Sequence, residues 1–217
     1  LMRTEYEQRQ ENNNRRRLKQ ANFPFTKTID ELDLSRYDGQ ISDLFISELA
    51  SCRFIDEKKN LVMIGNPGRG KTHMAIGIGL KACAGGKSVL FKNAASLSTE
   101  LSEAKDNYAL GKLEKRIQKV DLLIIDEMGY VSFDRFQSEL LFKVIADRSE
   151  RGSTIVTTNL AFSEWTNLFE NTAMVDLLVR QNRCFGVVIR RADGTYDAIP
   201  ADYTMLACGG IGGLYAH

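Results

Sequence analysis

Residues 64–76, "IGNPGRGKTHMAI", place a glycine-rich turn between two apolar runs. Within this stretch Gly65, Gly70, Lys71 and Thr72 fit the pattern G-x-x-x-x-G-K-[ST]. The pattern indicates a phosphate-binding loop only where a strand precedes it and a helix follows it. The flanking residues therefore decide whether this chain binds a nucleotide.

Both flanks have the required character. Residues 60–64 form a short apolar run typical of a buried strand, and 72–84 is compatible with a helix ended by two glycines. Residues 88–92 are then predicted to be a second strand. Because strand, helix and strand in this order need a crossover connection, the sequence predicts a parallel sheet and an α/β fold.

The loop also predicts how a nucleotide is bound. Glycines let backbone N–H groups converge on phosphate oxygens, and the start of the next helix adds partial positive charge. Lys71 would contact the β- and γ-phosphates, and Thr72 would be a ligand of Mg²⁺. His73 has no second His or Cys nearby, so we do not expect it to bind a metal. The predicted nucleotide-binding residues here are Gly65, Asn66, Pro67, Gly68, Arg69, Gly70, Lys71, Thr72 and His73.

The rest of the chain supplies further strands and helices. The run at 121–126 is apolar on both faces, as a central parallel strand must be. The helical pattern after the second strand is interrupted near Gly111. The other predicted elements are a strand at 153–159, helices at 42–54, 97–104, 113–120 and 136–145, and a hairpin from Cys184 onward that turns at Asp193-Gly194.

Polar residues end two of the predicted strands. Asp126 and Glu127 end the third strand, at the carboxyl edge where α/β proteins bind ligands. Asp126 is placed to bind nucleotide-associated Mg²⁺, and Glu127 to polarise the attacking water. The alternative is that these acids merely cap the next helix. Asn159 ends the fourth strand, which we expect beside the phosphate-loop strand, and it either orients the lytic water or is an ordinary turn residue.

Two arginines follow the core helices. Arg180 or Arg183 could act as an arginine finger on a neighbouring subunit's γ-phosphate, although surface arginines are commonly just solvated. The predicted catalytic residues are Lys71, Glu127, Asn159, Arg180 and Arg183. Residues 126–129 also fit the D-x-x-G pattern of GTPases, but no N-K-x-D signature occurs in the sequence, so ATP is favoured.

Positive charge is concentrated at the start of the chain. Residues 1–27 hold seven Lys or Arg against three Glu, about +4, whereas the whole chain carries +1. We expect an exposed basic helix or arm, ended by Phe23-Pro24-Phe25. It either binds DNA phosphates or is a solvated charge run. Its candidate DNA contacts are Arg15, Arg16, Arg17 and Lys19.

Cysteine usage and hydropathy exclude several classes of protein. The 4 cysteines include no C-x-x-C pair and there are 2 histidines, so neither a disulfide framework nor a zinc site is indicated. No apolar run approaches the roughly 18 residues that span a bilayer, and the polar N-terminus is unlike a signal peptide. We expect a cytoplasmic protein with no membrane contact. Because the chain begins Leu1-Met2, it could be a fragment.

Residues 122–165, "LLIIDEMGYVSFDRFQSELLFKVIADRSERGSTIVTTNLAFSEW", closely resemble the IstB family of AAA+ transposition helpers, relatives of the DnaC helicase loader. The likeness extends to "RRLKQANFPFTKTIDELDL" (16–34) and "LFKNAASLSTELSEAK" (90–105), and so covers most of 3–170. Walker motifs are shared by many ATPases, whereas "DEMGY" and "TTNLAFSEW" are narrower signals.

The resemblance implies a P-loop NTPase of the AAA+ initiator clade, with a parallel sheet flanked by helices. It implies ATP-dependent homo-oligomers on duplex DNA, with ATP and Mg²⁺ between subunits, that bend the DNA and deliver a target site to a partner transposase. A bacterial cytoplasm, close to the nucleoid, is the expected location. The helices at 97–119 would face DNA without reading its sequence. Their candidate contacts are Lys105, Lys112, Lys115, Arg116 and Lys119.

The resemblance also implies a domain organisation. Residues 1–27 would be a basic helical arm, the end of a truncated N-terminal domain, 28–200 the AAA+ ATPase domain, and 201–217 an unassigned tail. The family tends to carry Asp-Arg before its final strands, where this chain reads "VDLLVRQNRCFGVV" (175–188). Arg180 aligns with that arginine if Val179 replaces the aspartate.

Three functions are compatible with these features. The first is an ATPase with weak basal hydrolysis that DNA stimulates and with a transposase as client, a helicase being the alternative client. The second is a small-molecule kinase, which needs an acceptor site and usually an Arg-bearing lid. The third is a nucleotide-dependent binding module that barely hydrolyses ATP. The basic arm and the Asp-Glu pair at 126–127 favour the first.

Overall fold

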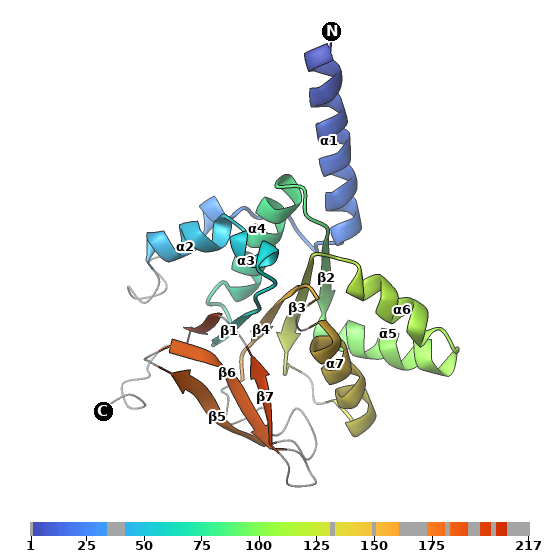
Figure 1. Ribbon diagram of the computed structural model, residues 1–217, viewed down its shortest axis with the longest axis vertical. Coiled ribbons are helices and arrows are strands. Elements are labelled where there is room, and N and C mark those ends of the chain that lie inside the picture. Colours follow the sequence, from blue (N-terminus) through green and yellow to red (C-terminus); the bar gives the residue numbers. More distant parts are fainter. Residues whose placement is uncertain are drawn as a thin grey trace.

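The computed structural model describes residues 2–33, 42–130, 133–148, 151–160, 173–180, 183–190, 196–200 and 203–207 (Figure 1). The helices are α1 (Met2–Ala21), a short 3-10 helix (Ile29–Glu31), α2 (Asp43–Ala50), α3 (Arg53–Asp56), α4 (Lys71–Ala84), α5 (Ala94–Asp106), α6 (Leu110–Gln118) and α7 (Arg135–Arg148). The strands are β1 (Leu61–Gly65), β2 (Val89–Asn93), β3 (Leu122–Met128), β4 (Ser153–Thr158), β5 (Ala173–Arg180), β6 (Arg183–Arg190), β7 (Tyr196–Pro200) and β8 (Tyr203–Ala207).

Five strands form a parallel sheet in the order β2-β3-β4-β1-β8. In the register of this sheet Leu61 of β1 pairs with Ile155 of β4 on one side and Tyr203 of β8 on the other. The predicted parallel sheet is confirmed, and β4 lies beside the phosphate-loop strand as expected. Because these strands run in one direction, the carboxyl ends of β1, β3 and β4 meet at one edge of the sheet.

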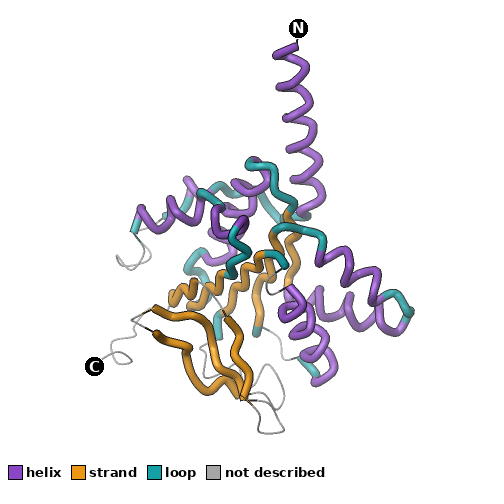
Figure 2. Tube along the Cα trace, in the orientation of Figure 1, coloured by secondary structure: helices purple, strands orange, loops and turns teal. Residues whose placement is uncertain are grey.

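Helices cover both faces of this sheet (Figures 1 and 2). Side chains of β3 alternate between the two layers because successive residues of a strand point to opposite faces. Leu122 and Ile124 pack in the core beneath α2, α3 and α4, whereas Leu123 and Ile125 pack beneath α5, α6 and α7. Both sets are buried, which explains why the sequence of β3 is apolar without alternation.

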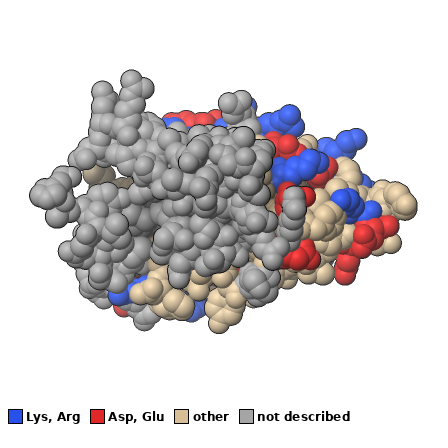
Figure 3. Space-filling view, turned by 90° about the horizontal axis from the view of Figure 1, so that it is seen from below, with Lys and Arg blue, Asp and Glu red and all other residues tan. Residues whose placement is uncertain are grey.

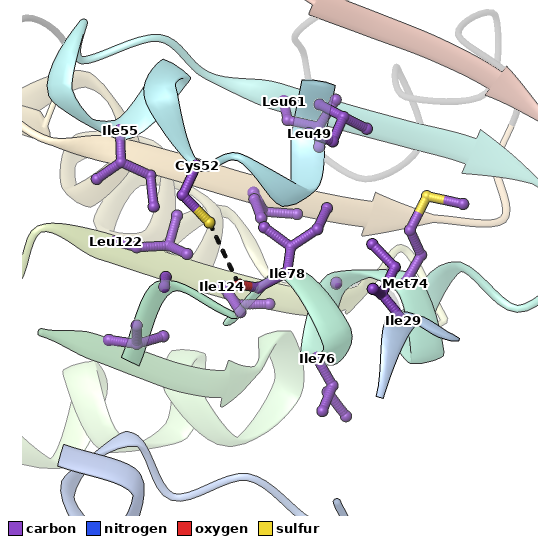
Figure 4. Close-up of a cluster of buried hydrophobic side chains, with 14 of the residues drawn as sticks. Ile29, Leu49, Cys52, Ile55, Leu61, Met74, Ile76, Ile78, Leu122 and Ile124 are labelled. Atoms are coloured by element: carbon purple, nitrogen blue, oxygen red, sulfur yellow. Dashed lines mark hydrogen bonds between the residues drawn. The ribbon is translucent and has the colours of Figure 1, made fainter. Parts of the chain in front are cut away.

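The first of these cores is drawn in Figure 4. Ile78 of α4 lies in it together with Cys52, and the Cys52 Sγ is 3.7 Å from the Ile78 carbonyl oxygen. Burial raises the pKa of the Cys52 thiol to about 11, and it has the same effect on Cys83. Both cysteines are free thiols that behave as small apolar core residues.

Arg148 ties the second helical layer to the sheet. Its buried guanidinium donates to the carbonyls of Ile117, Val120 and Ser153 at 2.6, 3.1 and 2.8 Å. It thereby satisfies carbonyls at the end of α6 and at the start of β4. Burial lowers the pKa of Arg148 to about 10, and its hydrogen bonds offset part of that desolvation cost.

Two predicted helix boundaries were wrong. The single helix predicted over 42–54 is divided into α2 and α3, because Cys52 adopts a left-handed conformation with φ of 57°. Ser42 caps α2 by accepting a hydrogen bond from the Phe45 N–H. The break expected near Gly111 lies at 107–109 instead, and Gly111 is inside α6.

The C-terminal strands only partly follow the prediction. The strand pairing of the predicted hairpin is confirmed, since β6 and β7 are antiparallel and Arg190 pairs with Tyr196. The turn expected at Asp193-Gly194 lies outside the described residues. β5 joins them to make a three-stranded sheet. The stretch predicted as an unassigned tail contributes β8 to the main sheet, where it pairs with the phosphate-loop strand.

The predicted basic helix at the start of the chain is α1, which projects from the body of the molecule (Figure 1). Its last turn is not solvated, because Ala21 is buried and Leu18 packs against the first core. The helix ends at Ala21, ahead of the expected Phe23-Pro24-Phe25 stop, where Asn22 takes a left-handed conformation. Within the part of the chain described, no helix combines the length and apolarity needed to cross a membrane.

Candidate nucleotide-binding site

A cavity of about 340 Å³ opens at the edge of the sheet where β1, β3 and β4 end. It brings the phosphate-loop residues together with Glu127 and Asn159, which lie far apart in the sequence. The residues that line it are Phe25, Lys27, Pro67, Gly68, Gly70, Lys71, Thr72, His73, Glu127, Tyr130, Thr157, Thr158 and Asn159.

The phosphate loop connects β1 to α4 as the sequence predicts. Gly68 and Gly70 have φ of 80° and 84°, a left-handed conformation that non-glycine residues rarely adopt. The Lys71 ammonium donates to the carbonyl oxygens of Gly65 and Asn66 at 2.5 and 2.9 Å. Its position at the start of α4 places this cation beside the N–H groups of the loop, as phosphate binding requires.

Asp126 is buried beneath the loop, with 4% of its surface exposed. One carboxylate oxygen accepts hydrogen bonds from the Thr72 hydroxyl at 2.9 Å and from the Thr157 hydroxyl at 2.5 Å. A hydroxyl and a carboxylate oxygen thus lie side by side at the foot of the loop. These are hard oxygen donors of the type that Mg²⁺ prefers, so the residues fit the predicted metal.

Glu127 lies beside Asp126 but is exposed to the cavity. Its φ of 58° turns the chain at the end of β3, where the register with β4 also shifts. The backbone N–H of Glu127 donates to the Thr157 hydroxyl at 3.0 Å, and the Asn93 amide donates to its carboxylate at 2.8 Å. Asn93 ends β2 and pairs in register with Asp126, so three neighbouring strands position this carboxylate.

Asn159 follows β4 and lines the same cavity. Its side-chain oxygen is buried, and nothing in the described part of the chain hydrogen-bonds it. A buried carbonyl oxygen without a partner is costly, so a donor from beyond the described residues is expected there. A water molecule between Asn159 and a bound phosphate would supply that donor.

Several residues of the cavity escaped sequence reasoning. Phe25 and Lys27, assigned to the basic arm, line the cavity, and so does the exposed Tyr130. The His73 ring lies with Nε2 2.7 Å from the Thr28 carbonyl oxygen, which fixes the segment containing Phe25 and Lys27 against α4. The usable signal for Thr157 and Asn93 was their position, since each is a polar residue at the carboxyl end of an apolar strand.

Other predicted site residues lie elsewhere. Gly65, Asn66 and Arg69 belong to the loop but do not line the cavity. Arg180 and Arg183 end β5 and begin β6, where they pair with each other in the register of the hairpin. They therefore lie at the adjoining ends of these two strands.

The candidate DNA contacts lie on two separate surfaces. On α1, Arg15, Arg16 and Lys19 are exposed and Arg17 is half-buried. On the α5–α6 pair, Lys112, Lys115, Arg116 and Lys119 line an open groove. Lys105 differs from them, because its ammonium lies 3.8 Å from the centre of the Phe136 ring and contacts α7.

Comparison with protein families identifies one match over most of the chain. The model of the IstB-like ATP binding protein family matches residues 1–188. A protein of the insertion sequence IS5376 from Geobacillus stearothermophilus, whose name describes it as ATP-binding, is 38% identical over 177 residues, covering 78% of this chain and 69% of that protein. The corresponding protein of insertion sequence IS21 from Pseudomonas aeruginosa is 34% identical, covering 79% and 66%. The chain spans about two thirds of the length of these relatives.

Solved structures place the fold among AAA+ P-loop ATPases. The crystal structure of the DnaC helicase loader is 28% identical, with a TM-score of 0.50 over 54% of this chain and 68% of that one. The replication initiator DnaA bound to AMPPCP and single-stranded DNA has a TM-score of 0.51 over 64% and 46%. At 16% identity, the second likeness concerns the fold alone.

Proposed function

The chain belongs to the IstB-like ATP-binding protein family, and from this premise we propose that it is an ATPase that assembles on duplex DNA and assists a transposase in choosing its target site. Its insertion-sequence relatives support the link to transposition. It would act in the bacterial cytoplasm, associated with the nucleoid. We propose a basic arm at 1–27, an ATPase domain at 28–200 and a tail from 201, with β8 of that tail completing the sheet of the ATPase domain.

The observation that carries the proposal is the composition of one cavity. The phosphate loop, the exposed carboxylate of Glu127 and the side chain of Asn159 line the same space, and Thr72 of the loop is hydrogen-bonded to the buried Asp126. Within the described residues the Asn159 side-chain oxygen has no hydrogen-bond partner. A binding module needs only the loop. Glu127 and Asn159 add groups that position water, which favours hydrolysis over binding alone.

Each residue has a defined task when ATP enters. Lys71 exchanges its contacts with Gly65 and Asn66 for phosphate oxygens. Mg²⁺, held by Thr72 and Asp126, would neutralise charge on the β- and γ-phosphates. Glu127 accepts a hydrogen bond from the attacking water, and Asn159 fixes the orientation of that water through its side-chain oxygen.

Arg180 and Arg183 are the two candidates for an arginine finger. We propose that one of them reaches the ATP of a neighbouring subunit in a homo-oligomer, since both lie at the adjoining ends of β5 and β6. DNA phosphates are proposed to bind the cations of α1 and α6, without sequence readout. Lys105 of α5 is not included in this set because its ammonium already lies over the Phe136 ring.

Steady-state ATPase assays with and without duplex DNA test the proposal. We expect weak basal hydrolysis that DNA raises. Glu127→Gln should abolish turnover while ATP binding is retained, because the amide cannot accept a proton from water. Turnover that survives in this variant would remove Glu127 from its role.

Lys71→Ala provides the matched control at the binding step. It should lose nucleotide affinity itself, measured with a fluorescent ATP analogue, because the cation on the phosphates is removed. Unchanged affinity would contradict the assignment of 64–76 as a phosphate-binding loop.

A helicase loader is the second candidate function, favoured by the 28% identity to the DnaC structure. The two functions differ in their protein client. Binding assays of the ATP-bound chain against the transposase of its own insertion sequence and against the replicative helicase distinguish them, since only the true client should bind in an ATP-dependent manner.

A further inference from the structure

Tyr108 is a fully exposed aromatic residue at the tip of the α5–α6 pair. All of its surface, 100%, is accessible. It follows the last turn of α5, where the Tyr108 N–H donates to the Lys105 carbonyl at 3.0 Å and the Ala109 N–H donates to the Ala104 carbonyl at 2.7 Å. These two bonds define a Schellman turn with Tyr108 at the left-handed position.

That position is unfavourable for tyrosine. Its φ is 57°, a conformation usually adopted by glycine at this place in the turn. The equivalent turn after α4 has Gly86 there, with φ of 90°. After α3 the residue is Lys58, whose charged end is easily hydrated, whereas the Tyr108 ring exposes apolar surface without gaining any packing. The fold therefore does not explain the tyrosine.

A row of cations begins four residues after Tyr108. Lys112, Lys115, Arg116 and Lys119 recur at helical spacing on the exposed side of α6, opposite the buried Leu113 and Ile117. Within the described residues none of these four forms an ion pair, whereas the nearby acids Glu100 and Glu114 are paired with Lys92 and Lys143.

The charges on the face shown in Figure 3 are mixed, with blue and red side chains interspersed away from the grey atoms. Because Glu100 and Glu114 are paired with Lys92 and Lys143, these two acids do not pair with the α6 cations. At a rise of about 1.5 Å per residue, the run from Lys112 to Lys119 along α6 is roughly 10 Å long, which is enough to contact more than one phosphate along one strand of DNA.

We infer that Tyr108 is a DNA wedge: its ring stacks against bases at a step of the duplex while the α6 cations hold the flanking phosphates. Exposed aromatic rings stack on bases of any sequence, and side chains inserted between base pairs unstack and kink the duplex. This inference rests on the proposed DNA function, and it names the residue that deforms the duplex.

The test compares the wild-type chain with Tyr108→Ala on a fluorescently labelled 40-base-pair duplex in the presence of ATP. Two quantities are measured: the dissociation constant over a range of salt concentrations, and the permanganate reactivity of thymines, which increases when bases unstack. We expect about tenfold weaker binding and loss of the reactive thymines in the variant. The salt dependence should stay the same, because the phosphate contacts are unchanged.

Matched variants separate this role from folding. Tyr108→Phe should behave as wild type because the ring is retained. Tyr108→Gly should lose the thymine reactivity yet melt at an equal or slightly higher temperature, since glycine prefers the left-handed conformation. Leu44→Ala, at an 80% exposed apolar residue of α2, should change neither quantity.

The outcomes distinguish the inference from the function on which it rests. If the wild-type chain binds DNA and Tyr108→Ala reproduces its affinity and thymine reactivity, the wedge is overturned and the DNA function stands. Loss of transposase binding in that variant, with DNA behaviour intact, would overturn the wedge in favour of a protein contact. A wild-type chain that does not bind duplex DNA overturns both.

Discussion

Thr157 links the two acidic residues at the end of β3. Its hydroxyl donates to the carboxylate of Asp126 and accepts from the backbone N–H of Glu127. One donor and one acceptor on the same oxygen keep Asp126 buried and turn Glu127 outward. The different roles of two adjacent acids therefore depend on a neighbouring strand.

Asn93 performs a similar double function on Glu127 and α5. Its amide nitrogen donates to the Glu127 carboxylate, and its oxygen caps α5 by accepting from the Ala95 N–H at 3.0 Å. Because the carboxylate is engaged by Asn93, it is less available to water. We expect Asn93→Ala to raise basal kcat, up to about tenfold, with little change in KM for ATP.

Asn93→Ser is the matched variant for this prediction. Serine retains a helix cap but is too short to reach Glu127, so it should raise kcat as alanine does. Alanine should additionally destabilise the protein by about 1 kcal/mol, measured by denaturant unfolding. A decrease in kcat in both variants would mean that Asn93 holds Glu127 in its active position.

At the scale of elements, α4 is the support of the nucleotide site. Its first turn carries the phosphate-binding Lys71 and Thr72, and the linker that contains Phe25 and Lys27 crosses its surface. A methyl group at Gly77 would lie 2.8 Å from the backbone nitrogen of Ile29, closer than van der Waals contact permits. The glycine thus allows linker and helix to touch.

Gly77→Ala should accordingly affect nucleotide binding although Gly77 does not line the cavity. The methyl group displaces the linker backbone, which we expect to cost about 1–3 kcal/mol of stability and to weaken ATP-analogue affinity through Phe25 and Lys27. Thermal melting and fluorescence titration measure the two effects. Unchanged affinity in a destabilised protein would show that the linker does not contribute to the site.

Gly111→Ala is the control for that substitution. Gly111 is also helical, but a methyl group there meets nothing within 4 Å. The same change should therefore stabilise the protein, by up to about 1 kcal/mol, because alanine favours the helix. If stability falls in Gly77→Ala and rises in Gly111→Ala, the loss at Gly77 is due to steric conflict and not to helix propensity.

At the scale of the whole molecule, the candidate DNA-binding cations lie on two projecting parts, α1 and the α5–α6 pair (Figure 1). The last turn of α1 is anchored in the core by Leu18 and Ala21, so its exposed face can be changed without unfolding the domain. Substitutions on that face therefore test the proposed electrostatic attraction to DNA independently of Tyr108.

Replacing Arg15 and Arg16 by Gln should weaken DNA binding and make it less sensitive to salt. The plot of log K against log salt concentration has a negative slope, and removing two phosphate contacts should reduce the magnitude of that slope by about two. Arg53→Gln with Lys58→Gln removes the same charge from α3 and its following turn, and should leave the slope intact. If both pairs have equal effects, net charge and not α1 attracts the DNA.

A mixing experiment tests the shared ATP site. Chains with Lys71→Ala cannot bind ATP, and chains with Arg180→Ala or Arg183→Ala lack one candidate finger. If ATP lies between subunits, a random mixture joins an intact ATP site to an intact finger in roughly one interface in four. We expect ATPase activity to reappear with only one of the two arginine variants. Absence of recovery with either would argue against a finger supplied by the neighbour.

Much of the site was predictable because each of its main residues lies in a short sequence pattern that can be recognised without the rest of the fold. The phosphate loop, Asp126, Glu127 and Asn159 all follow apolar strand patterns, and parallel strands bring their carboxyl ends to one edge. The division at Cys52 was not predictable, since an apolar periodicity does not reveal a residue in a left-handed conformation. β8 was missed for another reason: a short edge strand depends on pairing with β1 more than on its own pattern.

The sequence by itself determined the family, the sheet and the identity of the phosphate-binding loop, because glycine spacing and apolar runs act over a few residues. Only the tertiary structure decided that Thr157 and Asn93 hold the acids, that Phe25 and Lys27 line the cavity, and that the Tyr108 ring has no place in the core. Those outcomes depend on contacts between segments distant in the chain, and on the exposure that remains once packing is complete.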